Sequence, residues 1–200
     1  MYKPKPLKYP YNALEPYIDT ETINIHYNKH YLGYLKRLND LLVSLNYDFK
    51  LPIKQLLQNI EMFPIDKRDD IIFLAGGVLN HELYFDGLGK NNIPNGKILD
   101  KIIEQYGTYN NFKEEFIKKA KILVGSGYTS LVLTKTNDLD IINTSNQETP
   151  LLYGFKPILT LDLWEHAYYL KYRNQKDLYI AAFFNIIDFD TLNKRYEEEK

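Results

Sequence analysis

Apolar and aromatic residues recur every three or four positions in the early part of the chain, which is the period of a helix with one buried face. The members of this stripe are Ile23, Tyr27, Tyr31, Tyr34, Leu35, Leu38, Leu42 and Leu45. Asp19 or Thr20 is a suitable N-cap just before it, with Glu21 in the first turn. The pattern predicts one long helix over roughly residues 20 to 45.

A second stripe of the same period follows the turn at Pro64 to Asp66. Its members are Ile71, Leu74, Val78, His81, Phe85 and Leu88. Pro52 opens a short helical piece between the two long helices. Two long helices joined by a connection favour an antiparallel helical hairpin.

The period changes to that of strands in the second half of the chain. Residues 128–134, 139–144 and 157–162 are rich in β-branched and apolar residues. The turn formers of residues 136–138 separate the first two of these segments. We expect a small antiparallel sheet of about three strands.

Helical patterns lie on both sides of these strands. One predicted helix ends near Gly107, and another starts after Asn110 or Asn111 with acidic residues in its first turn. Two more are predicted over residues 165–174 and 178–197.

Turn-forming residues cluster between residues 87 and 96, including Asn91, Asn92, Pro94 and Asn95. We place a domain boundary near residue 90. The prediction is an α+β protein with an N-terminal helical hairpin domain, residues 1–90, and a C-terminal α/β domain with a small antiparallel sheet, residues 91–200. A proline- and tyrosine-rich segment, residues 7–16, is expected to lie as an extended strap on the surface.

Charge and cysteine content exclude several classes of function. The 25 Lys and Arg residues balance 26 Asp and Glu residues, so the basic excess that nucleic acid binding requires is missing. The chain starts without an apolar signal region and contains no apolar run that could span a membrane, which indicates a cytoplasmic protein without a membrane partner. Because cysteine is absent, any metal must be bound by nitrogen and oxygen atoms.

The four histidines lie at informative positions. His26 and His30 are four residues apart on the first helix, with Tyr34 four residues further on the same face. His81 lies on the apolar stripe of the second helix, and His166 follows Asp162 by four residues. Each histidine taken alone is more often a hydrogen-bonded core residue than a ligand.

Asp162 changes this balance, because it ends a very apolar segment and a buried carboxylate requires a cation or several donors. If the hairpin packs against the sheet, His26, His81, Asp162 and His166 can converge between the two halves. Three imidazoles and one carboxylate suit a transition metal, although such a set also serves other chemistry.

Several motifs make the chain similar to one known family. They are Tyr9 to Pro16, Ile25 to His30, Ala75 to Gly77 with Asn80 and His81, Gly125 to Gly127, Asn146 with Gln147, and the run Asp162-Leu163-Trp164-Glu165-His166-Ala167-Tyr168-Tyr169. In this order and composition they resemble the iron/manganese superoxide dismutases. The resemblance runs from about residue 7 to the C-terminal helix, and it implies a helical hairpin followed by an α/β domain, with the metal between them.

The resemblance also implies roles for single residues. His26, His81, Asp162 and His166 match the metal ligands. Four further residues match the surroundings of the metal: His30 and Tyr34 line the substrate funnel, Gln147 hydrogen-bonds the metal-bound solvent, and Trp164 forms an aromatic wall. Glu165 and Tyr169 match residues at the interface of a homodimer.

The implied activity is the conversion of superoxide, an antioxidant function, by one-electron cycling of one manganese or iron ion per subunit. Gln147 together with Gly77 is the manganese-type arrangement, whereas Tyr84 and Thr160 are closer to the iron type. We favour manganese, with iron or dual use as the alternatives. Tyr128 and Phe85 stand where the family usually carries tryptophan, and Lys176 stands where arginine is usual.

Two other functions use similar residues. A non-haem iron oxygenase would use two histidines and one carboxylate, and the fourth expected ligand argues against it. A catalytically silent family member would have lost a ligand, Tyr34 or Gln147, and all of these are present.

Overall fold

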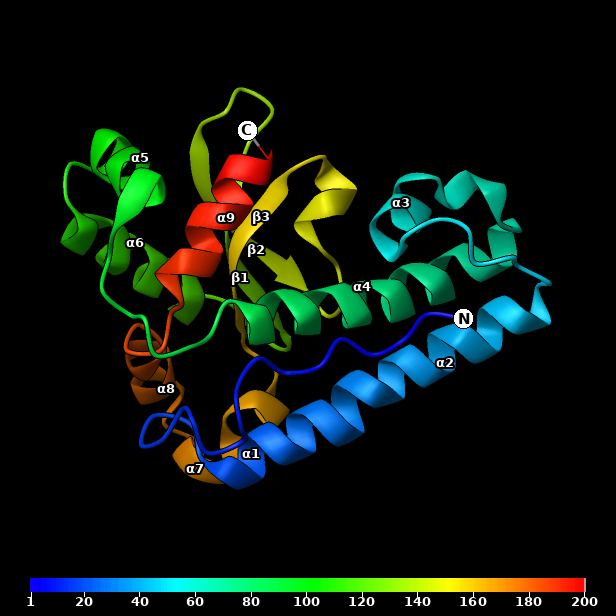
Figure 1. Cartoon of the computed structure of the whole chain (residues 1–200), viewed down its shortest axis with the longest axis horizontal. Coiled ribbons are helices and arrows are strands. Elements are labelled where there is room, and N and C mark those ends of the chain that lie inside the picture. The colour runs from blue at the N-terminus through cyan, green and yellow to red at the C-terminus, as the bar shows by residue number, and fades with distance from the viewer. Residues whose placement is uncertain (200) are drawn as a thin grey trace.

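Two long helical segments form an antiparallel hairpin in the N-terminal half of the chain, as the apolar stripes predicted (Figure 1). This computed structural model describes residues 1–199. The first segment consists of α1 (Thr20–Ile25), a π-helical stretch (His26–Tyr31) and α2 (Leu32–Ser44). The second is α4 (Arg68–Asp86), which packs along α2.

The first segment differs from the predicted uninterrupted helix at one place. Its start is as expected, because the Asp19 side chain accepts a hydrogen bond from the Thr22 N–H at 2.7 Å. From His26 to Tyr31, however, the helix is of the π type. Such turns widen a helix locally and are frequent at functional sites. Here the π turn contains both His26 and His30.

The connection between the two long segments contains α3 (Ile53–Gln58), which begins after Pro52 as predicted, and two 3₁₀ turns (Ile60–Met62 and Ile65–Lys67). The predicted stripe of the second helix was two residues too long. The helix ends at Asp86, and Leu88 forms an isolated antiparallel bridge with Ile187 near the other end of the chain.

A three-stranded antiparallel sheet forms the centre of the C-terminal half, as expected. Its strands are β1 (Gly127–Leu133), β2 (Leu139–Ser145) and β3 (Lys156–Asp162), in the order β2-β1-β3. In the register, Tyr128 lies opposite Asp162 on one side and opposite Thr144 on the other. The central strand is buried along its whole length, because β2 and β3 flank it and helices pack against the sheet.

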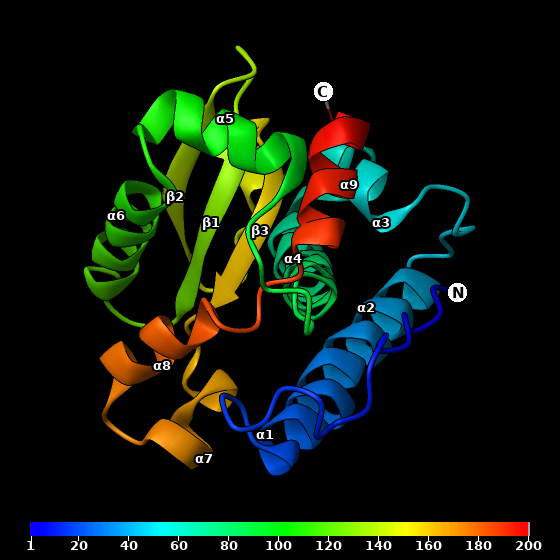
Figure 2. The same ribbon diagram turned by 60° about the vertical axis from the view of Figure 1, so that its left-hand side comes forward.

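Helices surround this sheet (Figure 2). The C-terminal half contains α5 (Gly96–Tyr106), α6 (Tyr109–Lys121), α7 (Tyr169–Tyr172), α8 (Lys176–Phe183) and α9 (Phe189–Glu199), with 3₁₀ turns at Pro150–Tyr153 and Glu165–Ala167. Helix α6 packs on β1 and β2, whereas α4 and α9 pack on β3. The sheet therefore meets the helical hairpin through β3, the strand that ends at Asp162.

Three predicted helix boundaries were wrong. Helix α6 begins at Tyr109 because the Thr108 side chain caps it by accepting from the Asn111 N–H at 3.1 Å. The helix predicted over residues 165–174 is a 3₁₀ turn followed by the short α7. The helix predicted over residues 178–197 is broken into α8 and α9. At the break the Asp188 N–H donates to Gly87 O at 2.8 Å and not to a carbonyl of the preceding helical turn.

The first ten residues run alongside α2 as an extended strap (Figure 2). The prediction of an extended strap over residues 7–16 was wrong for its second half, because residues 11–17 form consecutive turns in which the Ala13 N–H donates to Pro10 O and the Tyr17 N–H donates to Leu14 O, both at 2.9 Å. The Asn39 side chain accepts from the Tyr2 N–H at 3.0 Å and donates to Tyr2 O at 2.9 Å. Further along, the Tyr9 hydroxyl donates to Phe85 O at 3.0 Å. These contacts tie the strap to both long helices. No helix among residues 1–199 is long and apolar enough to cross a membrane.

Candidate metal centre

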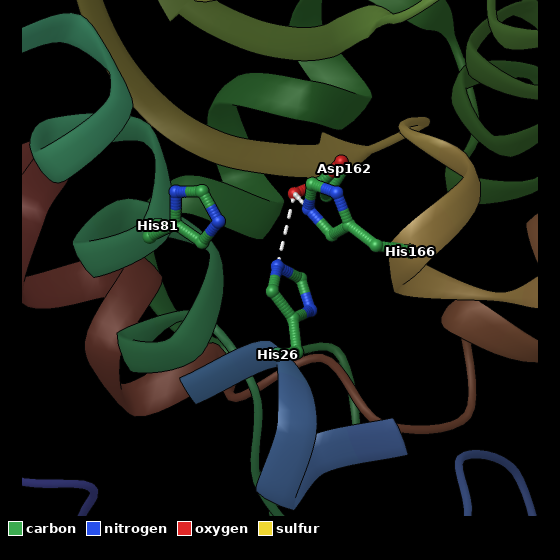
Figure 3. Close-up of side chains that lie close together, drawn as sticks. All are labelled: His26, His81, Asp162 and His166. Carbon is green, nitrogen blue, oxygen red and sulfur yellow. Dashed lines mark ion pairs between the residues drawn. The ribbon is translucent and has the colours of Figure 1, made fainter. Parts of the chain in front are cut away.

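The four residues expected to bind metal come together from four elements (Figure 3). His26 is the first residue of the π turn, His81 lies in α4, Asp162 ends β3, and His166 lies in the following 3₁₀ turn. Each offers one ligand atom, and these atoms all lie within 4.8 Å of one another. His26, His81 and Asp162 are fully buried, so the cluster lies inside the protein, between the hairpin and the sheet.

The facing atoms of this cluster have no ordinary partners. Asp162 Oδ2 lies 3.2 Å from His26 Nε2 and 3.6 Å from His166 Nε2. Among the described residues, however, Asp162 Oδ2 and the Nε2 atoms of all three histidines lack a hydrogen-bond partner. Buried polar atoms without partners are rare in native proteins, and an ion is one of the standard explanations.

The second polar atom of His81 and that of Asp162 are hydrogen-bonded. His81 Nδ1 lies 2.6 Å from the carbonyl oxygen of Gly77, to which it donates, so that its Nε2 lone pair faces the cluster. The second carboxylate oxygen of Asp162, Oδ1, accepts from the Trp164 N–H at 2.8 Å. These hydrogen bonds orient both side chains and leave one free donor atom on each for a metal.

Electrostatics in the cluster favour the metal-binding protonation states. Burial lowers the pKa of His26 to about 4 and that of His81 well below its usual value. Burial raises the pKa of Asp162, but His166 and His26 outweigh this effect and hold the pKa below its ordinary value. Metal binding requires neutral imidazoles and an ionised carboxylate, and His26, His81 and Asp162 have these forms at neutral pH. The residues therefore fit a transition metal such as iron or manganese.

Gln147 and Tyr34 are hydrogen-bonded beside the cluster. Gln147 Nε2 donates to the Tyr34 hydroxyl at 3.1 Å, and the Tyr128 hydroxyl donates to Gln147 Oε1 at 2.9 Å. The Asn80 side-chain amide donates to Gln147 O at 3.3 Å and to Glu148 O at 3.1 Å. The amide of Gln147 is thus held at its oxygen, its nitrogen and its backbone.

The role of Tyr128 was missed by sequence reasoning, which noted only that it replaces a tryptophan. Its hydroxyl is buried and donates a hydrogen bond to Gln147 Oε1. The only available signal was its position directly after the Gly125 to Gly127 motif, because the chain has 18 tyrosines. Lys176 likewise has a partner in the structure, since its ammonium group donates to Leu123 O at 2.9 Å.

His30 and Trp164 both lie against His166. The rings of His30 and His166 are stacked, with centroids 3.9 Å apart, and the Trp164 ring is stacked on His166 at 5.6 Å. Trp164 is itself anchored, because its indole N–H donates to Asn146 O at 3.0 Å. Glu165 and Tyr169, the expected interface residues, are exposed.

Comparison with known proteins agrees with this geometry. Residues 1–89 match the alpha-hairpin domain of iron/manganese superoxide dismutases, and residues 94–195 match the C-terminal domain of the same family. The chain is also 40% identical over 199 residues to the superoxide dismutase [Mn/Fe] of Methylomonas sp. (strain J), covering 98% of each chain. The buried cluster of three histidines and one aspartate thus lies in a chain that belongs to the iron/manganese superoxide dismutase family.

Proposed function

We propose that His26, His81, Asp162 and His166 bind one manganese or iron ion and that the protein is a superoxide dismutase. The observation that carries this proposal is the set of four buried donor atoms that face one another without hydrogen-bond partners. When bound, the ion supplies one-electron exchange, so that one superoxide is oxidised to oxygen and a second is reduced and takes up two protons as hydrogen peroxide.

Tyr34 is suited to supply one of these protons. Burial raises the pKa of its hydroxyl, which therefore keeps its proton at neutral pH. Because the hydroxyl oxygen accepts from Gln147 Nε2, its own proton points elsewhere, and no described residue accepts it. Gln147 thus orients Tyr34 as a donor toward a bound anion.

His30 is suited to pass protons from the solvent. It is half-buried, and burial lowers its pKa to about 4, so the imidazole is neutral at pH 7 and can both accept and donate a proton. Its stacking on His166 places it at the edge of the cluster. Trp164, which is stacked on His166, shields this ligand from water.

We favour manganese over iron because Gln147 in the sheet domain together with Gly77 on α4 resembles the manganese-type arrangement of the family. A Cβ atom at Gly77 would lie 2.5 Å from the Tyr34 ring, so a larger residue here would displace Tyr34. Tyr84 and Thr160 are the features that favour iron. Loading the apoprotein separately with each metal and comparing dismutation rates tests the preference: a faster manganese form supports it, equal rates indicate dual use, and a faster iron form reverses it.

We also propose a homodimer formed around Glu165 and Tyr169. Both side chains are exposed, and Tyr169 is 45% exposed although it is aromatic. Glu165 lines a cavity of about 370 Å³ together with Trp164, His166 and Lys176. Sedimentation of the purified protein tests the oligomeric state, and Glu165→Ala is expected to weaken the dimer. A wild-type protein that sediments as a monomer would contradict the proposal.

Residue 90 is proposed as the domain boundary, since the connection between α4 and α5 contains neither helix nor extended strand pairing beyond the single Leu88 bridge. Limited proteolysis tests it. Cleavage within residues 89–95 that leaves two stable fragments supports the boundary, and first cleavage elsewhere contradicts it.

A further inference from the structure

Two buried tyrosines form a hydrogen-bonded chain that ends on the backbone of Asp162. The Tyr179 hydroxyl donates to the carbonyl oxygen of Asp162 at 2.8 Å, and the hydroxyls of Tyr84 and Tyr179 lie 3.1 Å apart. All three residues have no exposed surface. These hydrogen bonds are therefore out of contact with solvent, and they reach Asp162 at its backbone carbonyl and not at its carboxylate.

Counting hydroxyl protons shows which tyrosine donates in each of these hydrogen bonds. A tyrosine hydroxyl has one proton to donate, and that of Tyr179 is used on the Asp162 carbonyl. The proton between the two hydroxyls must then come from Tyr84. The order is Tyr84 to Tyr179 to Asp162, and only the last bond reaches the backbone of the expected ligand.

Tyr179 hydrogen-bonds Asp162 at the end of β3. Asp162 is the last residue of β3 and lies opposite Tyr128 of β1, and the next residue, Leu163, donates its N–H to Gly127 O at the start of β1. On the side chain, Oδ1 is held by the Trp164 N–H. With its carbonyl and Oδ1 both fixed, the carboxylate can present only Oδ2 to the cluster.

Tyr84 links this carbonyl to the helical hairpin. It lies in α4, one turn after His81, and its ring centroid is 5.2 Å from that of His26. Tyr179 comes from α8. One chain of hydroxyls thus ties the helix that carries His81 and the strand that carries Asp162 to a third element.

We propose that Tyr179, supported by Tyr84, is a positioning residue that fixes the backbone of Asp162 so that its carboxylate meets the metal with one defined oxygen. The inference rests on the proposed metal site. Loss of the Tyr179 hydroxyl leaves a buried carbonyl unpaired and lets Asp162 shift, whereas loss of the Tyr84 hydroxyl removes only the support behind Tyr179.

The test compares three hydroxyl deletions in the manganese-loaded protein: Tyr179→Phe, Tyr84→Phe and, as a matched control, Tyr172→Phe. Tyr172 also donates to a backbone carbonyl, that of Tyr17, at 2.5 Å, and its ring centroid lies 5.8 Å from that of Tyr179. Its hydroxyl does not donate to Asp162 or to Tyr179, so it controls for the loss of a nearby tyrosine hydroxyl that makes no bond to a ligand. The readouts are the rate at which EDTA removes manganese, the visible absorption band of the oxidised manganese form, and the melting temperature of the apoprotein.

We expect release about tenfold faster for Tyr179→Phe, equivalent to about 1.4 kcal/mol, and a shifted absorption band. Tyr84→Phe should show a smaller effect of the same kind. Tyr172→Phe should lower the melting temperature but leave release and spectrum unchanged. Wild-type release and spectrum in both Tyr179→Phe and Tyr84→Phe would overturn the inference alone, whereas wild-type protein that binds neither manganese nor iron would overturn the proposed function with it.

Discussion

Gln147 Nε2 donates to the hydroxyl of Tyr34 at 3.1 Å, although 113 residues separate the two in sequence. This bond joins the loop after β2 to the first long helix, across the line where the helical hairpin meets the sheet. It also decides which way the Tyr34 proton points. The proton supply to the site therefore depends on how firmly the Gln147 amide is held.

Tyr128→Phe tests how firmly that amide is held. The substitution removes the donor at 2.9 Å from Gln147 Oε1 and leaves the ring in place, so the amide loses its fixed orientation. Dismutation should fall by about tenfold, which is typical when a residue that orients a metal-site group is lost. The metal content should stay at the wild-type level. A variant with unchanged activity would show that Tyr128 only fills space.

Gly76→Ala tests the close approach of the loop to α4. A Cβ atom at Gly76 would lie 2.0 Å from Gln147 O, so the backbone of the loop must move and carry Gln147 with it. We expect a loss of about 2 kcal/mol or more in the free energy of unfolding and a large loss of activity.

Gly33→Ala is the matched control, because Gly33 lies inside α2 and its Cβ would meet nothing within 4 Å. Alanine in a helix interior stabilises by about 0.5–1 kcal/mol relative to glycine. Chemical denaturation of both variants gives the comparison. Equal effects of the two substitutions would contradict the proposed packing.

Much of the site could be predicted from the sequence, because the spacing of residues within each motif indicates which of them lie together on one element. Asp162 ends the expected third strand, and His26 and His30 lie in the first long helical segment, although in a π turn of it; His166 lies in a 3₁₀ turn where a helix was expected. Spacing could not show that residues as distant as His26 and His81 meet around Asp162; the resemblance to a family implied it, and the structure brings their ligand atoms together.

The details that sequence reasoning missed have physical causes. The π turn at His26–Tyr31 was invisible because a single wider turn hardly changes the period of the apolar stripe. The break before α9 was missed because the apolar pattern continues through it, while Ile187 pairs with the distant Leu88. Contacts between residues distant in sequence thus determine such details, which the local hydrophobic pattern does not show.

Tyr31→Phe tests the attachment of the N-terminal strap. The Tyr31 hydroxyl is buried, accepts from the Lys5 N–H at 2.7 Å and donates to Glu82 Oε1 at 2.9 Å. Its loss should cost about 1–3 kcal/mol, because it leaves buried polar groups unpaired. Tyr27→Phe is the control, since its hydroxyl donates to Lys5 O at 2.9 Å in a solvent-exposed position and should cost less than 1 kcal/mol.

Thermal or chemical unfolding measures both of these variants. Equal costs would mean that the buried contact from Tyr31 to Glu82 contributes nothing beyond the exposed one.

Acid should destabilise the apoprotein through its buried histidines. Burial holds the pKa of His26 at about 4 in the folded state, against an ordinary value of 6.5. Below pH 6.5 the unfolded chain binds more protons than the folded one, so the free energy of unfolding falls as the pH drops from 6.5 to 4. The contribution of His26 is about 3 kcal/mol.

Chemical denaturation of the apoprotein at several pH values measures this dependence. In the control variant His26→Gln, the free energy of unfolding should change less steeply with pH. A slope that is the same in both proteins would contradict the assignment to His26.

The most direct test of the metal centre is the rate of superoxide decay with wild-type protein and with His81→Ala, each purified after exposure to manganese and to iron, with bound metal measured on the same samples. We expect the wild-type protein to retain about one ion per chain and to remove superoxide, and His81→Ala to have neither tightly bound metal nor activity. Full metal content and wild-type activity in His81→Ala would contradict this expectation.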